Sequence, residues 1–419
     1  MRRLELVIDR LSKSGEGVAE VSGRAVFVPG ALPGETVLAE VSDSGKALRA
    51  ELLSILKASL ARRQPMCSKA GECGGCDWMH ITEDEQVAWK ESIVTSALEH
   101  VGRVKPGSYE QLPTVRSPRV LGYRRRATLH PTKGKLGFFG KRSHVRVEID
   151  ECPALTDSLS TLPRVLAEAL GPSVKDLEEV RLLECEGRVA VSFHAKGPLR
   201  PRHRQALEAL VRDGVLDGGV LAPGEGKGAL ETVGEPTLTE DGLLHRPDGF
   251  AQANAEVNRA LVRQAVELLE VNGGEAVLEL YAGNGNFTFP LAERAATVLA
   301  VESAAVSVML AQAAARQRGV GNVRFVQGAC EKIADGLVKE GARFDRLLLD
   351  PPRTGAPGVG AWAARLLVSR VVYVACDPAA LARDAAALAA QGFRPIALQV
   401  VDLFPQTRHV EAVMVFARG

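Results

Sequence analysis

The sequence predicts an α/β chain with a doubly wound sheet at its C-terminal end, a mainly β central segment and a small β-barrel at its N-terminal end. Strand-like and helix-like stretches alternate from about residue 260 onward. Short apolar stretches separated by Gly, Pro and Ser-Asp fill the first part of the chain. A length of 419 residues also exceeds one ordinary domain. We therefore expect domains at residues 1–57, 58–255 and 256–419.

The composition is that of a globular protein, with 46% hydrophobic and 25% charged residues. A formal net charge of +1 gives no overall attraction to nucleic acid, so an RNA contact would need a local patch. The first residues lack the apolar core of a signal peptide, and no run of about 18 apolar residues occurs. We therefore expect a cytoplasmic protein that does not enter a membrane.

The N-terminal segment is read as a barrel because its strand-like stretches are short and regularly punctuated. They are LELVIDRL, GVAEV, RAVFVPG, ETVLAEV and AELLSIL. Small barrels of this kind commonly bind oligonucleotides. In the central segment we expect a helix near 82–101, which could pack on the C-terminal domain, and mainly strands over 110–250 with helices at SLSTLPRVLAEAL and HRQALEALVRDG.

In the C-terminal segment, stretches with the sequence pattern of strands alternate with stretches that have the pattern of helices. Strand-like stretches are VLELYAG, VLAVES, RLLLDPP, VVYVACDP and AVMVFA, and helix-like stretches are NRALVRQAVELLE, SVMLAQAAARQ and PAALARDAAALAAQG. Such alternation predicts parallel strands joined by right-handed crossovers. Ligands of such sheets bind outside the carboxyl ends of the strands.

Three of these strand ends carry residues suited to a nucleoside ligand. Gly283 and Gly285 form a turn in which the backbone can approach a ligand, and Glu302 ends the next strand, where an acid can accept hydrogen bonds from ribose. Asp350 begins DPPR at the end of a third strand. A phosphate site would favour a third spaced glycine or a Gly-Lys-Ser/Thr ending, and neither is present. We interpret the crevice as a class I S-adenosylmethionine site in a Rossmann-like methyltransferase domain.

Cys376 and Glu411 are the candidate reacting residues. Cys376 follows an apolar strand and precedes a helix, whose N-terminal dipole favours thiolate, although a buried structural thiol is the ordinary alternative. Thiolate addition to carbon 6 of uracil makes carbon 5 nucleophilic enough to take a methyl group, and a base must then remove the carbon 5 proton. Glu411, just before the last strand, is a carboxylate suited to that step.

With these residues in place, the chain resembles the RNA uracil-5-methyltransferase family nearly end to end. Its YVACDPAALARD is similar to the family's YVSCNPxTLARD, and the order of its first strands resembles a TRAM domain, an OB-like RNA-binding barrel. The resemblance implies that Cys376 is the nucleophile and Glu411 the proton-abstracting base. It also implies that Asp350 helps to position the uracil, and that the methyl donor is surrounded by Gln252, Tyr281, Asn286, Glu302 and Asp350.

Two departures from the family pattern bear on this site. Asp377 replaces the more frequent Asn after the nucleophile, which adds a negative charge that would oppose thiolate formation. Ala329 stands where many relatives have a polar residue near the adenine, so that contact would have to come from the backbone. Neither departure removes a reacting group.

A cysteine cluster lies in the predicted central domain. Seven cysteines in a large cytosolic chain point to metal binding or catalysis rather than to a disulfide framework. Cys67, Cys73 and Cys76 form C-x5-C-x2-C, and Cys152 supplies a fourth thiol. Four thiolates can hold zinc or an iron–sulfur cubane, and spacing does not separate the two. Family members with this cysteine set carry a [4Fe-4S] cluster, so the resemblance implies iron, in a structural or RNA-positioning role.

Residues 116–146 contain ten Lys and Arg residues and no Asp or Glu, with aromatic residues interleaved. A basic run is often only a solvated face, but this combination suits phosphate contacts and base stacking. We therefore expect Tyr123, Arg124, Arg125 and Arg126 to contact RNA, and the target uridine to flip out of a loop.

The sequence therefore favours an RNA 5-methyluridine synthase. By resemblance the cysteine cluster and barrel favour 23S ribosomal RNA as substrate, and transfer RNA is the alternative. Two other readings compete: a non-catalytic RNA-binding iron–sulfur protein, which would not need Cys376 and Glu411, and an amino-group methyltransferase with a DPPY motif. Arg353 stands where that motif has its stacking aromatic residue. We expect a monomer.

Overall fold

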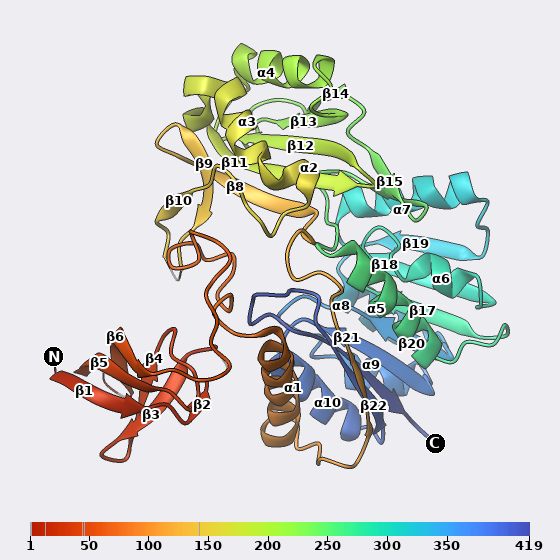
Figure 1. The fold of residues 1–419 in the computed structure, drawn as a ribbon. Coiled ribbons are helices and arrows are strands. Elements are labelled where there is room, and N and C mark those ends of the chain that lie inside the picture. Colours follow the sequence, from red (N-terminus) through yellow and green to blue (C-terminus); the bar gives the residue numbers. More distant parts are fainter. Residues whose placement is uncertain (1, 13, 44, 46, 142) are drawn as a thin grey trace.

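Three large sheets and a two-stranded hairpin make up the β structure of the computed structural model, which describes residues 2–12, 14–43, 45, 47–141 and 143–419 (Figure 1). The N-terminal sheet has the strand order β1-β5-β6-β4-β3-β2. Its strands are β1 (Arg2–Val7), β2 (Arg10–Leu11), β3 (Gly17–Val21), β4 (Arg24–Val28), β5 (Thr36–Asp43) and β6 (Leu48–Lys57). Alternate residues of β5 point inward, so Val37 and Ala39 enter the core of this small domain.

The central sheet has the order β10-β9-β8-β11-β12-β13-β14. Its strands are β8 (Arg126–Thr132), β9 (Lys135–Phe139), β10 (Arg146–Glu148), β11 (Leu177–Cys185), β12 (Arg188–Ala195), β13 (Gly218–Ala222) and β14 (Glu231–Gly234). The associated helices are α2 (Asp157–Ser160), α3 (Leu162–Leu170), the 3-10 helix η1 (Gly171–Asp176) and α4 (Pro201–Arg212). Both longer helices are amphipathic, and Leu166 and Leu207 pack from them against the sheet. A hairpin of β15 (Leu238–Glu240) and β16 (Leu243–His245) follows.

The C-terminal sheet has the order β19-β18-β17-β20-β21-β23-β22-β7. Its strands are β7 (Glu110–Val115), β17 (Ala276–Leu280), β18 (Thr297–Glu302), β19 (Val323–Gln327), β20 (Arg346–Leu349), β21 (Arg370–Ala375), β22 (Arg394–Val401) and β23 (Glu411–Ala417). Strands β17 to β21 are parallel, whereas β23 runs antiparallel between β21 and β22. The chain leaves β17 towards β18 and returns at β20, so the order reverses between β17 and β20, where such sheets bind ligands.

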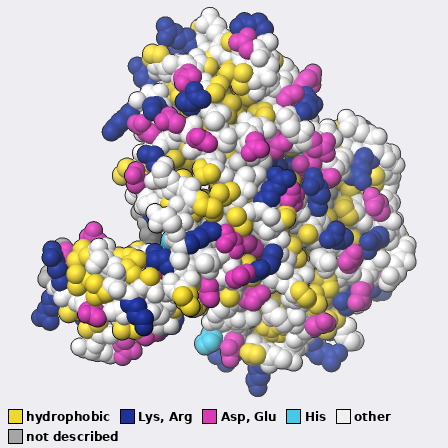
Figure 2. Space-filling view, in the orientation of Figure 1, with side chains coloured by type: hydrophobic (Ala, Val, Ile, Leu, Met, Phe, Trp, Pro, Cys, Tyr) yellow, Lys and Arg dark blue, Asp and Glu magenta, His cyan; other side chains and the backbone are white. Residues whose placement is uncertain are grey.

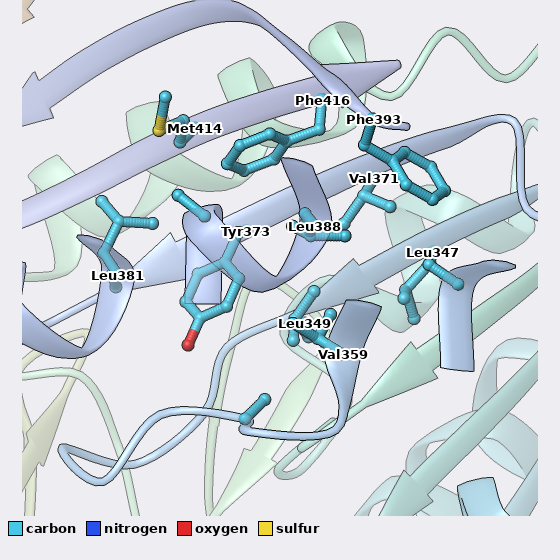
Figure 3. Close-up of a cluster of buried hydrophobic side chains, with 14 of the residues drawn as sticks. Leu347, Leu349, Val359, Val371, Tyr373, Leu381, Leu388, Phe393, Met414 and Phe416 are labelled. Atoms are coloured by element: carbon cyan, nitrogen blue, oxygen red, sulfur yellow. The ribbon is translucent and has the colours of Figure 1, made fainter. Parts of the chain in front are cut away.

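Helices cover both faces of this sheet (Figure 1). They are α1 (Glu83–His100), α5 (Ala255–Leu268), α6 (Thr288–Ala292), α7 (Ala305–Arg318), α8 (Cys330–Glu340), α9 (Val359–Arg365) and α10 (Pro378–Ala389). Figure 3 shows the core on one face, where Leu349 and Tyr373 meet Val359 and Leu381 from the covering helices. Burial of each such side chain is worth roughly 1.5–3 kcal/mol, so this core fixes the strand ends that carry the site.

Helix α1 and strand β7 belong spatially to the C-terminal sheet, although they lie in the segment predicted as central. Val94 and Leu98 of α1 enter the core shared with α10, and β7 extends the sheet beside β22. The expected packing of the helix near 82–101 on the C-terminal domain is thus confirmed. The predicted fold class is confirmed as well, whereas β7, β19 and β22 are strands that the periodicity did not single out. Across the described residues, every helix is too short or too polar to span a bilayer.

Candidate active site

The glycine turn after β17 is held by the acid at the end of β18. The backbone amide of Gly283 donates to Glu302 Oε2 at 3.0 Å, and Glu302 Oε1 accepts from the Ala304 amide at 2.7 Å. Gly283 and Gly285 have φ angles of +58° and +98°. A Cβ at Gly285 would lie 2.5 Å from the Phe289 ring, so a glycine is required there. The predicted residues therefore meet in one crevice.

Three further residues predicted for the methyl-donor site are held by hydrogen bonds to other parts of the chain. Tyr281 is held at φ +64°, an unusual value for an aromatic residue, and its hydroxyl donates to Glu331 at 2.8 Å. Asn286 exchanges two amide hydrogen bonds with Asn258 of α5, at 2.9 and 3.0 Å. Gln252 lies in the segment before α5, and its carbonyl accepts from Arg125 Nε at 2.8 Å. The side chains of Tyr281 and Asn286 are thus held by other elements, whereas Gln252 is held through its backbone.

The sheet register places Cys376 opposite Glu411. Antiparallel pairing of β21 with β23 ends at Ala375 and Ala412, and one further step along both strands brings Cys376 across from Glu411. Directly opposed residues have Cα atoms about 4.5–5.5 Å apart and side chains on the same face. Asp350, at the end of the neighbouring strand β20, stands close enough to repel charge on both. The two reacting residues predicted from distant parts of the sequence are therefore brought together.

The prediction that Cys376 favours thiolate is wrong for the free protein. Burial raises the pKa of the Cys376 thiol to about 12, and the carboxyl groups of Glu411 and Asp350 add to that rise. Arg353, which is exposed at the rim, opposes the rise. The helix dipole falls off within the first turn and is outweighed by desolvation and two acids. Cys376 is therefore a neutral thiol at physiological pH.

The two carboxyl groups beside Cys376 are also shifted towards their neutral forms. Burial raises the pKa of Asp350 to about 7. Burial also raises the pKa of Glu411 well above its ordinary value, and the nearby Asp350 raises it further. A carboxylate whose pKa is raised is a stronger base than a solvated one. The arrangement thus suits proton removal from a carbon acid more than storage of a negative charge.

The Asp377 departure has a local explanation. The Asp377 carboxylate accepts a hydrogen bond from the Ala380 amide at 2.8 Å and caps α10, with Pro378 in the first helical position. An asparagine would cap the helix in the same way. The charge of Asp377 is thus directed at helix amides, and burial, Glu411 and Asp350 are the dominant contributions that raise the Cys376 pKa. Ala329 precedes α8 as its N-cap without a side-chain cap.

The loop at residues 402–410, which leads into Glu411, is anchored by buried hydrogen bonds from elsewhere in the chain. Lys90 of α1 is fully buried and donates to Asp402 at 2.5 Å and to the Phe404 carbonyl at 2.9 Å. Gln86 and Gln406 exchange hydrogen bonds of 3.0 and 2.8 Å. Breaking a buried ion pair by removing one partner costs about 3–5 kcal/mol, so α1 holds this loop firmly.

The same loop contacts the residues that follow Cys76. The Trp78 amide donates to the Gln406 carbonyl at 2.9 Å. Asp77 accepts from the Arg408 amide at 3.1 Å and from its guanidinium at 2.7 Å. Sequence reasoning missed this connection, because neither Asp77 nor Arg408 belongs to a motif. It joins the cysteine-bearing loop to the strand that carries Glu411.

Cys67, Cys73, Cys76 and Cys152 line one cavity. Burial raises the pKa of Cys76 to about 12 and raises those of Cys73 and Cys152. Among the described residues, no three His, Cys, Asp or Glu side chains stand close enough to hold a single metal ion. Zinc would need its sulfurs about 2.3 Å from one point. The four thiols predicted from two distant segments therefore line one cavity, without a grouping that could already hold a metal ion among the described residues.

The expected exposed RNA-binding patch at residues 123–126 is wrong for two of its four residues. Tyr123 is buried and donates from its hydroxyl to the Pro405 carbonyl at 2.9 Å. Arg125 is 2% exposed and forms an ion pair with the buried Glu240. Arg124 and Arg126 are half-buried, and Arg126 donates to the Gly249 carbonyl at 2.8 Å. These residues join the central domain to the active-site loops.

Acids from elsewhere in the chain neutralise much of the remaining basic run. Arg116 pairs with Asp84, Arg119 with Glu256, and Lys135 with Asp150. Figure 2 shows basic and acidic side chains interspersed on the visible face. The lack of acidic residues within this segment of the sequence therefore does not mean that its basic side chains lack acidic neighbours in the folded protein.

A groove of about 710 Å³ offers a different surface for a partner. The N-terminal barrel, the cysteine loop, strands β8 and β9, and Arg408 all line it. Within it the rings of His130 and Phe139 stand 4.2 Å apart, and Phe139 remains 39% exposed. An exposed aromatic beside basic residues suits the stacking of an unpaired base. Only the interleaved aromatic residues of 116–146 gave a signal for this groove in the sequence.

Comparisons with known proteins show which family the chain resembles. The family model "tRNA (Uracil-5-)-methyltransferase" matches residues 244–418, and the TRAM domain model matches residues 2–53. A 23S rRNA (uracil(1939)-C(5))-methyltransferase RlmD from Alkalilimnicola ehrlichii is 37% identical, over 99% of this chain and 96% of its own length. The RlmD protein of Aeromonas salmonicida is 34% identical over 99% of this chain and 96% of its own length. The chain belongs to the RNA uracil-5-methyltransferase family.

A solved structure of this family has the same fold throughout. The tRNA (uracil-54, C5)-methyltransferase of Pyrococcus abyssi, in complex with S-adenosyl-L-homocysteine, has a TM-score of 0.76 and 25% identity. The match covers 99% of this chain and 100% of that one. The predicted enzyme class, an S-adenosylmethionine-dependent RNA uracil-5-methyltransferase, and the N-terminal TRAM domain are therefore confirmed.

Proposed function

We propose that this methyltransferase modifies carbon 5 of a flipped-out uridine in 23S ribosomal RNA, with Cys376 as covalent nucleophile and Glu411 as base. The observation that carries the assignment is the register of β21 and β23, which sets these two residues face to face at the crevice. The target RNA is supported by relatives that match nearly end to end and are named for 23S rRNA. Transfer RNA is the second candidate, favoured by the Pyrococcus abyssi neighbour.

The chemistry follows from the positions of these groups. The Cys376 thiol gives its proton to water as its sulfur bonds to carbon 6 of the uracil, which leaves an enolate; carbon 5 of the enolate would take the methyl group of S-adenosylmethionine, with S-adenosylhomocysteine as the leaving group. Glu411 then removes the proton from carbon 5, the carbon–sulfur bond breaks, and Cys376 is released. Bound S-adenosylmethionine supplies the methyl group and brings a positive sulfonium into an acidic site. Positive charge there favours the ionised forms of Glu411 and Asp350.

We assign the methyl-donor site to residues from three strand ends, those of β17, β18 and β20, and from the segment before α5. Glu302 accepts hydrogen bonds from the ribose, a role favoured by its place at the end of β18. Gly283 and Gly285 allow the backbone to approach the donor. The full set is Gln252, Tyr281, Gly283, Gly285, Asn286, Glu302 and Asp350.

We further propose that the cysteine cavity holds a [4Fe-4S] cluster on Cys67, Cys73, Cys76 and Cys152. Four thiols around one cavity fit a cubane with four protein ligands, and the resemblance to family members with this cysteine set favours iron over zinc. The cluster supplies a rigid anionic centre, and the chain's own residues around it order the loop that contacts residues 406–408. The RNA would lie in the groove beside this loop, in contact with the TRAM domain.

A trapping experiment tests the nucleophile and the reaction type together. A 23S rRNA fragment with 5-fluorouridine at the target position has no carbon 5 proton to lose, so the covalent protein–RNA adduct should persist and migrate as a heavier band. Cys376→Ala should give no adduct, and Cys185→Ala, which changes a buried cysteine of the central domain, should trap like the wild type. Equal trapping by Cys376→Ala would refute the assignment.

Nucleoside analysis separates the alternatives in substrate and product. Incubation with uridine-containing 23S rRNA and transfer RNA transcripts should give 5-methyluridine in the first and little in the second. Preferential modification of transfer RNA would favour the second candidate, and a methylated exocyclic nitrogen would indicate an amino-group methyltransferase. Protein purified without oxygen should carry iron and sulfide and absorb visible light, whereas stoichiometric zinc would refute the cluster proposal.

A further inference from the structure

The start of the central sheet contains three consecutive arginines with different surroundings. Arg125 is neutralised by the buried Glu240, and Arg126 donates to the Gly249 carbonyl. Arg124 lines the cysteine cavity, and its buried Nε has no hydrogen-bond acceptor among the described residues. No ion pair among these residues includes Arg124 either. Arg125 and Arg126 are therefore partnered by protein oxygens, whereas Arg124, which contacts Tyr123, keeps an unsatisfied Nε beside the cavity that the four cysteines line.

A buried donor without an acceptor is expensive. Leaving a buried polar group unsatisfied costs roughly 1–3 kcal/mol, and more when the group is charged. The neighbouring Tyr123 hydroxyl oxygen can accept a hydrogen bond from the Arg124 guanidinium while its proton goes to the Pro405 carbonyl, but Arg124 Nε still has no acceptor among the described residues. Such a group in a native fold points to an acceptor that comes from outside the protein.

The backbone fixes Arg124 beside the cavity independently of its side chain. Its amide donates to the Ala154 carbonyl at 2.9 Å, and its carbonyl accepts from the Thr156 amide at 3.0 Å. It also forms β-bridges to Leu155 and Asn254. The segment 153–156 follows Cys152 directly, so Arg124 is tied to one of the four cysteine positions. Removing the guanidinium should leave this backbone arrangement in place.

We propose that Arg124 is a positioning and charge-compensating residue of the cysteine site, whose guanidinium donates hydrogen bonds to the sulfur atoms of a bound anionic iron–sulfur cluster. This inference rests on the proposed cluster and adds a residue to its site. A [4Fe-4S] centre with four thiolate ligands carries net negative charge in both of its usual oxidation states, and a guanidinium is permanently positive. Lys69 and Glu151 also line the cavity, with opposite charges that offset one another.

The proposal makes two measurable statements. Residues that contact metal ligands through hydrogen bonds typically change metal affinity 10–100-fold when mutated, so Arg124→Gln should lose iron to a chelator roughly tenfold faster. One-electron reduction by dithionite adds a negative charge to the centre, which Arg124 would stabilise. Arg124→Gln should therefore be harder to reduce, with a lower midpoint potential. Arg124→Lys keeps the charge and should show a smaller change in both.

The experiment uses the full-length protein reconstituted with iron and sulfide without oxygen. Iron release to a ferrous chelator and the reduced signal in electron paramagnetic resonance are measured for wild type, Arg124→Gln, Arg124→Lys and the control Arg126→Gln. The control should match the wild type, because Arg126 already has a protein acceptor. Circular dichroism is used to check that each variant is folded. If Arg124→Gln does not fold, the comparison of Arg124→Lys with the wild type tests the proposal instead.

The possible outcomes separate a failure of the proposed role of Arg124 from a failure of the cluster proposal on which that role depends. A wild type that binds no iron under these conditions refutes the cluster, and the role of Arg124 with it. A wild type that binds the cluster while both Arg124 variants match it in release rate and potential refutes only the role of Arg124. Equal effects of Arg124→Gln and Arg126→Gln would also overturn the proposal, since they would indicate a general disturbance of the strand.

Discussion

The cysteines to which we assign functions lie in two regions, and the electrostatic surroundings of these regions differ. Around Cys376 the neighbours are Glu411 and Asp350, which discourage a standing negative charge. Around the four cysteines the neighbours include Arg124, whose charge lowers the pKa of Cys76 against the effect of burial. A thiol that must form and break a bond in each catalytic cycle is kept neutral until the substrate arrives. Thiols that would carry charge permanently are given a cation.

The largest effect is expected when the acid beside the nucleophile is removed, which tests whether Glu411 acts on the reaction at Cys376. Glu411→Gln keeps the shape of the side chain but cannot accept the carbon 5 proton, so turnover should fall by about 10²–10⁴-fold. Addition and methyl transfer remain possible, and methylated RNA should therefore stay attached to Cys376. Denaturing gel electrophoresis with uridine-containing RNA should reveal that adduct.

A control and a contrary outcome complete this test. Glu293→Gln alters an exposed glutamate of the same domain, paired with Arg318, and should turn over like the wild type. If Glu411→Gln releases free 5-methyluridine RNA at the normal rate, the proton goes elsewhere. Asp350, also close to Cys376, would then be the first alternative base.

A feature of the site could be predicted from the sequence when the residues that form it lie in one segment of the chain. The glycine turn, the end of β18 and the nucleophile were all readable, because each is a local motif at a strand end. The helix after Cys376 was equally visible, and it led to the wrong protonation state. The acids that decide that state, Asp350 and Glu411, come from other strands, and their effect depends on a register that no local pattern specifies.

The basic residues between 116 and 146 are a second case in which the decisive contacts come from distant parts of the chain. The partners of Arg116 and Arg125 lie in α1 and in the β15–β16 hairpin, so the absence of acids between residues 116 and 146 did not describe the surface. The cysteine site was easier to predict, since three of its four thiols are close in sequence. Its unpaired arginine was not, because an unsatisfied donor is visible only once every other contact is known.

The pH dependence of the rate at which Cys376 reacts with an alkylating agent reports how strongly its surroundings oppose the thiolate form. With a pKa of about 12, the thiolate fraction at neutral pH is small and grows about tenfold with each pH unit below that value. Alkylation by iodoacetamide should therefore accelerate steadily between pH 7 and pH 10 without reaching a plateau. Mass spectrometry of the Cys376 peptide gives the rate.

The same measurement in Glu411→Gln isolates the contribution of the acid. Removing one repelling carboxyl group should lower the pKa of Cys376 and raise its alkylation rate at pH 9 by about three- to tenfold. Cys330 is buried and its pKa is also about 12, so it should remain unmodified in both proteins and serves as an internal control. A plateau near pH 7 in the wild type would mean that the helix dipole prevails over the two acids.

The smallest effect concerns whether the two sulfur regions are mechanically connected. Asp77, which follows Cys76, binds Arg408, and Arg408 lies three residues before Glu411. Asp77→Asn keeps an oxygen for the Arg408 amide but loses the ion pair, which is partly exposed and worth about 1 kcal/mol or less. Because this contact acts on the loop of the base, release of the adduct should slow by about two- to fivefold while its formation is unchanged. Asp84→Asn removes the more exposed pair with Arg116 and should change neither rate. Quenched-flow separation of adduct formation from release measures both, and a change in formation alone would place Asp77 with the RNA contacts and not with the positioning of Glu411.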